Sequence, residues 1–160
     1  MDIRKMRMPY EVRWARKEEW SPAIKMIWRT FMKFEGKDYT EEGIKRFFEF
    51  IMDEELYLLF LKGEYRLMVA LDSGHVIGAG SVRDKNRLSL LFVDEAYHRR
   101  GVGSAILKKL CEYLSEVGER YMSLHAAPYA VNFYRKQGFR AVRPEMEFCG
   151  IRVTPMEKVF

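Results

Sequence analysis

Cysteine and histidine are scarce in this sequence, and neither is arranged as a metal site. The two cysteines, Cys111 and Cys149, have no metal-ligand spacing and suggest no framework of disulfide pairs. The three histidines lie far apart in the chain, so the sequence predicts no metal. This cysteine usage favours a reducing, cytoplasmic compartment over an extracellular, disulfide-bonded one.

Long apolar runs and linker-like segments are also missing. No stretch of eighteen apolar residues occurs, so we expect no transmembrane helix and no membrane partner. The first residues, MDIRKMRMPYEV, carry charges in place of an apolar segment, so we expect no secretory signal. No repeat, low-complexity stretch or linker rich in proline and serine divides the chain. Residues 1–160 are therefore predicted to form a single domain.

The formal charge of the chain is moderately positive, at +5. Such a charge is compatible with a nucleic-acid partner, with a phosphorylated small molecule, or with solubility alone. The basic residues are spread along the chain between acidic ones, and no recognised nucleic-acid-binding motif occurs. We therefore expect no nucleic-acid partner.

Apolar spacing predicts one strand and two helices in the N-terminal third. Residues 10–16 alternate between apolar and charged, which is typical of a half-buried strand. Ser21 followed by Pro22 favours a helix start, and Gly36 is expected to end that helix. Thr40 is expected to cap a second helix.

From residue 56 the pattern changes to short runs of leucine, β-branched and aromatic residues between turn signals. These runs predict strands over 56–61, 65–71, 75–83 and 87–93, although the first can be an extension of the second. Further elements follow along the chain: a helix over 102–117, a strand over 120–126, a short helix over 128–137 and two short strands within 139–160.

Arg99, Arg100 and Gly101 stand immediately before the helix predicted over 102–117, and Gly103 follows in its first turn. The stretch lacks the Lys-Ser/Thr ending of a P-loop and the third glycine of a dinucleotide-binding fingerprint. Backbone N–H groups at a helix N-terminus have no partner within the helix, and the helix dipole adds roughly half a positive charge there. Glycines let an anion approach those donors. The predicted diphosphate cradle consists of Arg99, Arg100, Gly101, Val102, Gly103 and Ser104.

Longer stretches around this cradle resemble a known family. The strand LSLLFV, the loop DEAYHRR, the GVG and the helix after it resemble motif A of the GNAT superfamily of N-acetyltransferases. Further along, AVNFYRKQGF is similar to that family's next motif, and VTPMEKV to its last strand. The resemblance extends from Tyr10 to Val159. His98 departs from the usual Gln or Arg, and Ala127 from an Asn that touches the cofactor in many relatives, for which Asn132 is a candidate substitute.

This resemblance implies an α/β (α+β) fold with a central, mixed, mostly antiparallel sheet of six to seven strands, about four flanking helices, and a splay between strands four and five. It implies acetyl-CoA as cosubstrate, with the diphosphate on the cradle and the pantetheine arm paired to the backbone of Leu91, Phe92 and Val93. A backbone N–H at a bulge near Phe92 or Val93 is the expected oxyanion donor. A homodimer through the C-terminal strands is possible in such a family.

Acetyl transfer also needs a neutral amine and a proton for the leaving thiolate. The resemblance implies Tyr134 as general acid, and simple packing is the alternative role. Deprotonating a lysine amine at pH 7 costs about 4.6 kcal/mol, whereas an α-amino group costs only about 1 kcal/mol. The start of strand four, residues 87–89, holds no carboxylate. We therefore hypothesise either an acceptor amine of low pKa or a water chain that ends at His125 as base.

In this family the first two helices and their loop select the acceptor. The corresponding stretch here, FMKFEGKDYTEEG, offers carboxylates to a cationic amine and aromatic rings for packing. The sequence therefore predicts an N-acetyltransferase whose acceptor is a primary amine of an unidentified small molecule or peptide. The alternative is a non-catalytic acyl-CoA-binding module, which the missing carboxylate base favours. The carboxylates of this stretch are Glu35, Asp38, Glu41 and Glu42.

Overall fold

The computed structural model describes residues 10–148 and 150–160, and Cys149 lies outside them. Within that part of the chain, one sheet runs in the order β1-β2-β3-β4-β5-β8-β6, and β7 pairs with β8. The strands are β1 (Glu11–Trp14), β2 (Leu67–Asp72), β3 (His75–Arg83), β4 (Arg87–Val93), β5 (Tyr121–Ala126), β6 (Arg140–Ala141), β7 (Met146–Phe148) and β8 (Ile151–Val159). The α-helices are α1 (Trp20–Phe34), α2 (Glu41–Ile51), α3 (Glu54–Leu61), α4 (Val102–Glu116) and α5 (Val131–Lys136).

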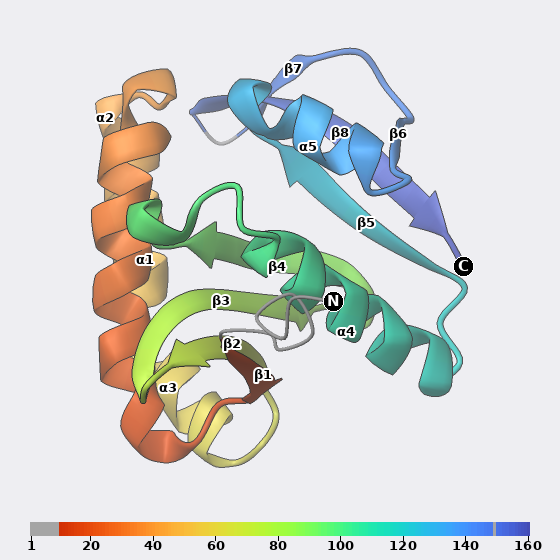
Figure 1. The fold of residues 1–160 in the computed structure, drawn as a ribbon. Helices are drawn as coiled ribbons and strands as arrows, with labels where there is room; N and C mark the ends of the chain where they lie inside the picture. The colour runs from red at the N-terminus through yellow and green to blue at the C-terminus, as the bar shows by residue number, and fades with distance from the viewer. Residues whose placement is uncertain (1–9, 149) are drawn as a thin grey trace.

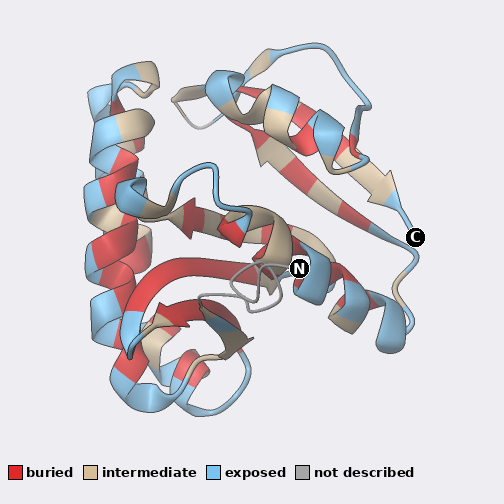
Figure 2. Cartoon of the chain, in the orientation of Figure 1, coloured by how far each residue is buried: buried red, intermediate tan, exposed pale blue. Residues whose placement is uncertain are grey.

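Helices cover both faces of the sheet, as the sequence predicted (Figure 1). On one face α1, α2 and α3 pack on β2, β3 and β4, and Phe31 stacks on Phe47 with ring centroids 4.1 Å apart. On the other face α4 and α5 enclose a second core around Ile106 and Leu110. The most deeply buried strands are β2 and β3, which lie between the two cores (Figure 2).

Two element boundaries differ from the sequence-based expectation. The first helix begins at Trp20 and not after Ser21, and Pro22 lies in its first turn, where its missing N–H costs no hydrogen bond. The strand expected over 56–61 is wrong, because these residues belong to α3. A short apolar run does not separate strand from buried helix by periodicity, and the signal that does is Asp53, whose carboxylate accepts from the Glu55 N–H at 2.9 Å.

The predicted cap of the second helix is confirmed. The Thr40 hydroxyl caps α2 by accepting from the Gly43 N–H at 3.0 Å. The segment after Phe139 contains three strands among the described residues, one more than expected. No helix in the described part of the chain has the length and apolar character needed to cross a membrane.

The central irregularity of the sheet is the splay between β4 and β5. These parallel strands are paired only at Arg87 and Ser123, beyond which they diverge (Figure 1). A register shift places Leu88 opposite Val82 and Leu90 opposite Ser81, so the extra residue of the bulge is Ser89. The bulge therefore lies nearer the start of β4 than expected, because Phe92 and Val93 keep regular register with β3.

Candidate functional site

The N-terminus of α4 has the geometry of an anion cradle. Gly101 is the helix N-cap with φ 78°, and Arg99 is also left-handed at φ 64°. The first helical bond runs from the Ala105 N–H to the Gly101 carbonyl at 3.0 Å. The N–H groups of residues 102–104 precede that bond, so they have no carbonyl partner within the helix. The Gln137 side chain donates to the Ser104 hydroxyl at 2.9 Å and ties α5 to the cradle.

Glycine at position 103 leaves room for neighbouring side chains as well as for an anion that approaches the N–H groups. A Cβ at this position would lie 3.3 Å from Phe133 Cζ and 3.5 Å from Val93 Cγ2. The glycine thus lets β4, α4 and α5 approach one another closely at the cradle. Arg100 lies over the ring of Tyr97, with its guanidinium carbon 5.3 Å from the centroid. An anion with several oxygen atoms, such as a diphosphate, fits this set of N–H donors and positive charge.

The backbone of β4 offers polar groups to the splay at alternate residues. The Asp94 N–H donates to Ile77 of β3 at 2.8 Å, so by strand alternation the Phe92 N–H also faces β3. The polar groups of Leu91 and Val93 consequently face β5 and the gap. His98 Nε2 donates to the Val93 carbonyl at 2.7 Å, which leaves the Leu91 groups and the Val93 N–H for a ligand.

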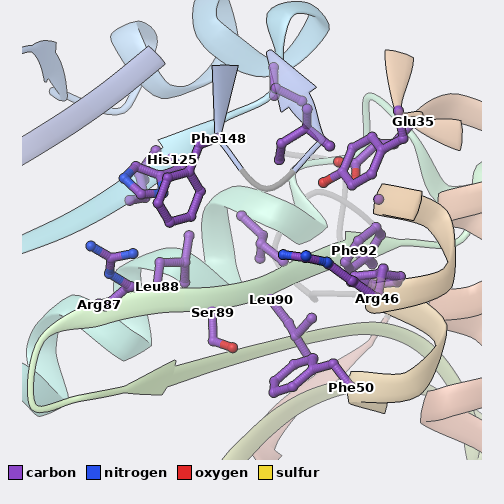
Figure 3. Close-up of a pocket in the computed structure, with 18 of the residues that line it drawn as sticks. Glu35, Arg46, Phe50, Arg87, Leu88, Ser89, Leu90, Phe92, His125 and Phe148 are labelled. Carbon is purple, nitrogen blue, oxygen red and sulfur yellow. The ribbon is translucent and has the colours of Figure 1, made fainter. Parts of the chain in front are cut away.

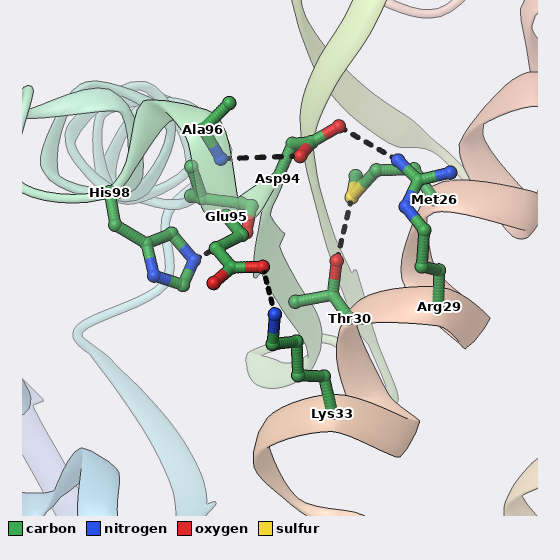
Figure 4. A network of polar contacts seen from close by, with 9 residues as sticks. Met26, Arg29, Thr30, Lys33, Asp94, Glu95, Ala96 and His98 are labelled. Carbon is green, nitrogen blue, oxygen red and sulfur yellow. Dashed lines mark hydrogen bonds and ion pairs between the residues drawn. The ribbon is translucent and has the colours of Figure 1, made fainter.

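A polar network holds the loop after β4 against α1 (Figure 4). Arg29 pairs with Asp94 at 2.7 Å, and Lys33 pairs with Glu95 at 2.5 Å. His98, which stands where the GNAT pattern has Gln or Arg, packs on Phe34 with ring centroids 4.9 Å apart. These contacts fix the direction in which the chain enters the cradle.

Two cavities meet beside Tyr134. One lies between β4, α4 and α5, and we call it the cofactor cavity because it is lined by most of the predicted cradle and by Leu91, Phe92 and Val93. The acceptor cleft lies between α2, β4, β5 and β7 and contains His125 (Figure 3). The residues that line both cavities form the junction, and they are Glu35, Leu91, Phe92, Ala130 and Tyr134.

The carboxyl group of Glu35, at the junction, lies near three tyrosine hydroxyls. The Tyr129 hydroxyl donates to Glu35 Oε1 at 3.3 Å. Burial raises the pKa of Glu35 to about 7, assisted by the charge of Asp38 and opposed by the Tyr129 hydrogen bond. Burial, and then the Glu35 charge, raise the pKa values of Tyr39, Tyr129 and Tyr134, so these phenols stay protonated at neutral pH.

His125 lies in the same cleft, on β5. Its ring meets Phe148 edge-on with centroids 4.6 Å apart. Burial lowers its pKa, as do the positive charges of Arg87 and Arg143, so His125 is neutral at pH 7. Among the described residues that line the cleft, His125 and Glu35 are the two side chains suited to accept a proton at neutral pH, and Glu35 is the one of them that belongs to the junction.

The structure brings most, but not all, of the predicted site residues to these cavities. Asn132 is exposed on α5 and lines neither cavity, and Arg100 lies outside the cofactor cavity's lining although its neighbour Arg99 is part of it. The proximity of Glu35 to Tyr134 was not predicted, since the sequence suggested only that Glu35 contacts the acceptor. No group of three or more potential metal ligands occurs within residues 10–148 and 150–160.

Solved structures show that this architecture is an acetyltransferase fold. A GCN5-related N-acetyltransferase from Rhodopseudomonas palustris superposes with a TM-score of 0.79, at 21% identity over 94% of this chain and 95% of that one. The PaiA N-acetyltransferase from Thermoplasma acidophilum, solved in complex with coenzyme A, gives 0.77 at 17% identity over 96% and 100% of the two chains.

The family model for the acetyltransferase (GNAT) domain matches residues 35–160, so the chain belongs to the GNAT family. An uncharacterised N-acetyltransferase of Methanocaldococcus jannaschii is 23% identical over 87% of this chain. Another, from Bacillus subtilis, is 34% identical over 55% of it. The chain covers 64% of the length of each of these two relatives.

Proposed function

We propose that this protein transfers the acetyl group of acetyl-CoA directly to a primary amine, and that acetyl-CoA occupies the cofactor cavity. The observation that carries the proposal is the junction, where a cavity ending in an anion cradle meets a second cavity beside Glu35 and Tyr134. The cradle residues 99–104 hold the diphosphate, and the open backbone of β4 holds the pantetheine arm. Acetyl-CoA supplies an activated thioester, and the protein supplies orientation and proton transfer.

Glu35 is the proposed general base. A carboxyl with a pKa of about 7 is about half ionised at pH 7, and its pKa lies closer to that of an amine than the pKa of an ordinary carboxyl does, so it accepts the acceptor's proton at a lower cost. The Tyr129 hydrogen bond orients the carboxylate. Glu35 thus supplies the base that the start of β4 lacks, and the low pKa of His125 makes that residue the weaker base of the two.

Tyr134 is the proposed donor to the departing thiolate, as the family resemblance implied. Its side chain is only 9% exposed and lies where both cavities meet. Because its pKa is raised, complete proton transfer is unfavourable, and a hydrogen bond to the sulfur as charge develops is the main contribution. The N–H groups of Leu91 and Val93, which face the gap, are the candidate donors to the acetyl oxygen.

A turnover assay tests this proposal. Release of free thiol from acetyl-CoA is measured with a panel of amines that includes α-amino peptides, lysine peptides and polyamines. We expect amine-dependent thiol release and an acetylated product detected by mass spectrometry. Binding of acetyl-CoA without turnover on any amine would instead identify a non-catalytic acyl-CoA-binding module, and absence of both would overturn the proposal.

A further inference from the structure

The acceptor cleft is positively charged at the end away from the junction. Arg83 of β3 and Arg87 of β4 line this end, and Arg46 of α2 also lines the cleft. Among the described residues that line the cleft, Glu35 is the one carboxylate. Figure 3 shows Arg87 beside His125, with Glu35 on the opposite side of the cleft. The two ends of the cleft therefore carry different charge.

Two of these arginines form a like-charge pair across the sheet. Arg83 and Arg87 are directly opposite in the antiparallel register of β3 and β4, an arrangement that destabilises a sheet unless an anion lies near. Asp84 is 3.6 Å from Arg83, but both side chains are well exposed, so this pair is weak. No ion pair to Arg87 occurs within residues 10–148 and 150–160.

Local contacts direct this charge toward the cleft. The Arg83 guanidinium lies over the Phe50 ring of α2, 5.0 Å from its centroid, which holds the side chain on the acceptor face of the sheet. Arg87 lies beside His125 in the cleft (Figure 3), and its positive charge is one cause of the lowered pKa of that histidine. Arg46 pairs with Glu42 of its own helix at 3.2 Å and is not part of the like-charge pair.

Strand geometry sets the distance between this charge and the reacting centre. Leu91 of the junction is four positions after Arg87, which is at most about 13 Å along the strand because the bulge at Ser89 shortens this stretch. The arginine side chain spans part of that length, so an anion bound there lies roughly 7–13 Å from the reacting amine. In an extended peptide with a free N-terminal amine, this distance corresponds to an acidic group about two to four residues along the chain.

We propose that Arg83 and Arg87 bind an anionic group of the acceptor, a carboxylate or a phosphate, so that the substrates are amines carrying such a group at this distance. This inference rests on the proposed acetyltransferase function. Guanidinium groups suit both anions because they donate paired N–H bonds to two oxygens. Polyamines and other purely cationic amines are disfavoured, since they would place positive charge against these arginines.

Short peptides with a free α-amino group test the inference by binding and by turnover. Four peptides differ only at the third residue, which is glutamate, phosphoserine, glutamine or lysine. Affinity is measured by fluorescence anisotropy in the presence of CoA, and kcat/KM is measured with acetyl-CoA. We expect one or both anionic peptides to exceed the glutamine peptide by about tenfold, mainly in Kd and KM, with the lysine peptide weakest. Which anionic peptide is preferred identifies carboxylate or phosphate as the ligand.

Variants separate a specific contact from general charge. Arg87→Gln and Arg83→Gln are each expected to reduce the preference for the anionic peptides severalfold, and Arg87→Glu to favour the lysine peptide. The control Arg120→Gln removes the same charge at an exposed position outside the cleft and should keep the parent's preference. Added salt should reduce the preference as well.

The binding and turnover measurements test the anion site and the acetyltransferase proposal independently. Equal affinities for all four peptides, no measurable binding, or the same loss of preference in Arg120→Gln would overturn the inference, whether or not acetylation occurs. Selective binding of an anionic peptide that depends on Arg87, without thiol release, would support the anion site and overturn the acetyltransferase proposal.

Discussion

At the scale of single residues, the proposed chemistry depends on where Glu35 titrates. A base must be deprotonated before it accepts a proton, so activity requires the ionised carboxylate. With a pKa of about 7, this form is lost as the pH falls through neutrality. The protein environment that raises the pKa thus moves the working range of the base close to physiological pH.

The first prediction follows from this titration. In the parent, kcat/KM should rise with pH through about 7 and then level off, apart from any ionisation of the acceptor amine. Glu35→Gln should lower kcat/KM at pH 7.5 by roughly 10²-fold, because glutamine cannot accept the proton. It should also remove the limb near pH 7, that is, the rise of kcat/KM with pH. A pH–rate profile from pH 5.5 to 9 measures both effects.

His125→Gln is the matched control for that profile, because His125 is the other proton acceptor in the cleft. We expect it to keep the limb near pH 7. If the limb persists in Glu35→Gln and disappears in His125→Gln, the histidine is the base and the assignment of Glu35 is wrong.

The second prediction concerns the Tyr134 hydroxyl. Tyr134→Phe keeps the ring that packs edge-on against Phe139, with centroids 5.6 Å apart, and removes only the donor. We expect kcat to fall by roughly 10- to 100-fold while the Kd for acetyl-CoA changes by less than about twofold. Stopped assays and calorimetry provide the two numbers. An unchanged kcat would mean that Tyr134 only packs.

Single residues also show what the sequence reveals about the site. The helix start with its arginines and glycines was predictable because its signal is local, and anion binding there stays a prediction. The position of Glu35, the proposed base, was not predictable, since its proximity to Tyr134 joins residues from distant parts of the chain and its pKa depends on burial. The bulge at Ser89 was misplaced because pairing with β3 sets its position.

At the scale of elements, α4 lies unusually close to β3. A Cβ at Gly80 would be 2.7 Å from Ile106 Cγ2 and 3.1 Å from Leu110 Cδ1, both fully buried. A Cβ at Gly78 would likewise be 2.9 Å from Ile106 and Val102. These two glycines let the helix that forms the cradle pack directly on the sheet.

The third prediction tests this packing. Gly80→Ala should destabilise the fold by about 1–3 kcal/mol, because β-branched Ile106 cannot turn aside without moving α4. For a domain of this size the loss lowers Tm by roughly 3–10 °C. Gly36→Ala is the control, since its Cβ would meet Met32 at an ordinary 3.6 Å. Equal Tm values for the two variants would contradict the account of helix placement.

Helices and strands were predictable from the sequence where the spacing of the apolar residues fits only one of the two. Helices α1, α2 and α4 have long faces spaced for a helix, and β3 and β4 have clear turns beside them, so each was predicted correctly. The run 56–61 was mistaken for a strand because it is apolar at nearly every position, and only the capping residue Asp53 distinguishes the helix.

At the scale of the whole molecule, the splay divides the sheet into two parts. Strands β1 to β4 lie on one side and β5, β8 and β6 on the other, and β4 and β5 are paired only through Arg87 and Ser123. Helix α4 packs against strands of both parts. The acceptor cleft is lined by β4 of one part and by β5 of the other, whereas the strand that lines the cofactor cavity is β4.

The central claim is that the basic, glycine-containing start of α4 binds the diphosphate of acetyl-CoA. Calorimetric titration of the protein with acetyl-CoA tests it most directly, alongside Gly103→Glu and the control Ser115→Glu, which adds the same charge at the far end of α4. We predict micromolar binding by the parent and by Ser115→Glu, and none by Gly103→Glu. The Tm of each variant is measured alongside to establish that it is folded. No binding by the parent, or equal binding by all three proteins, would contradict the account.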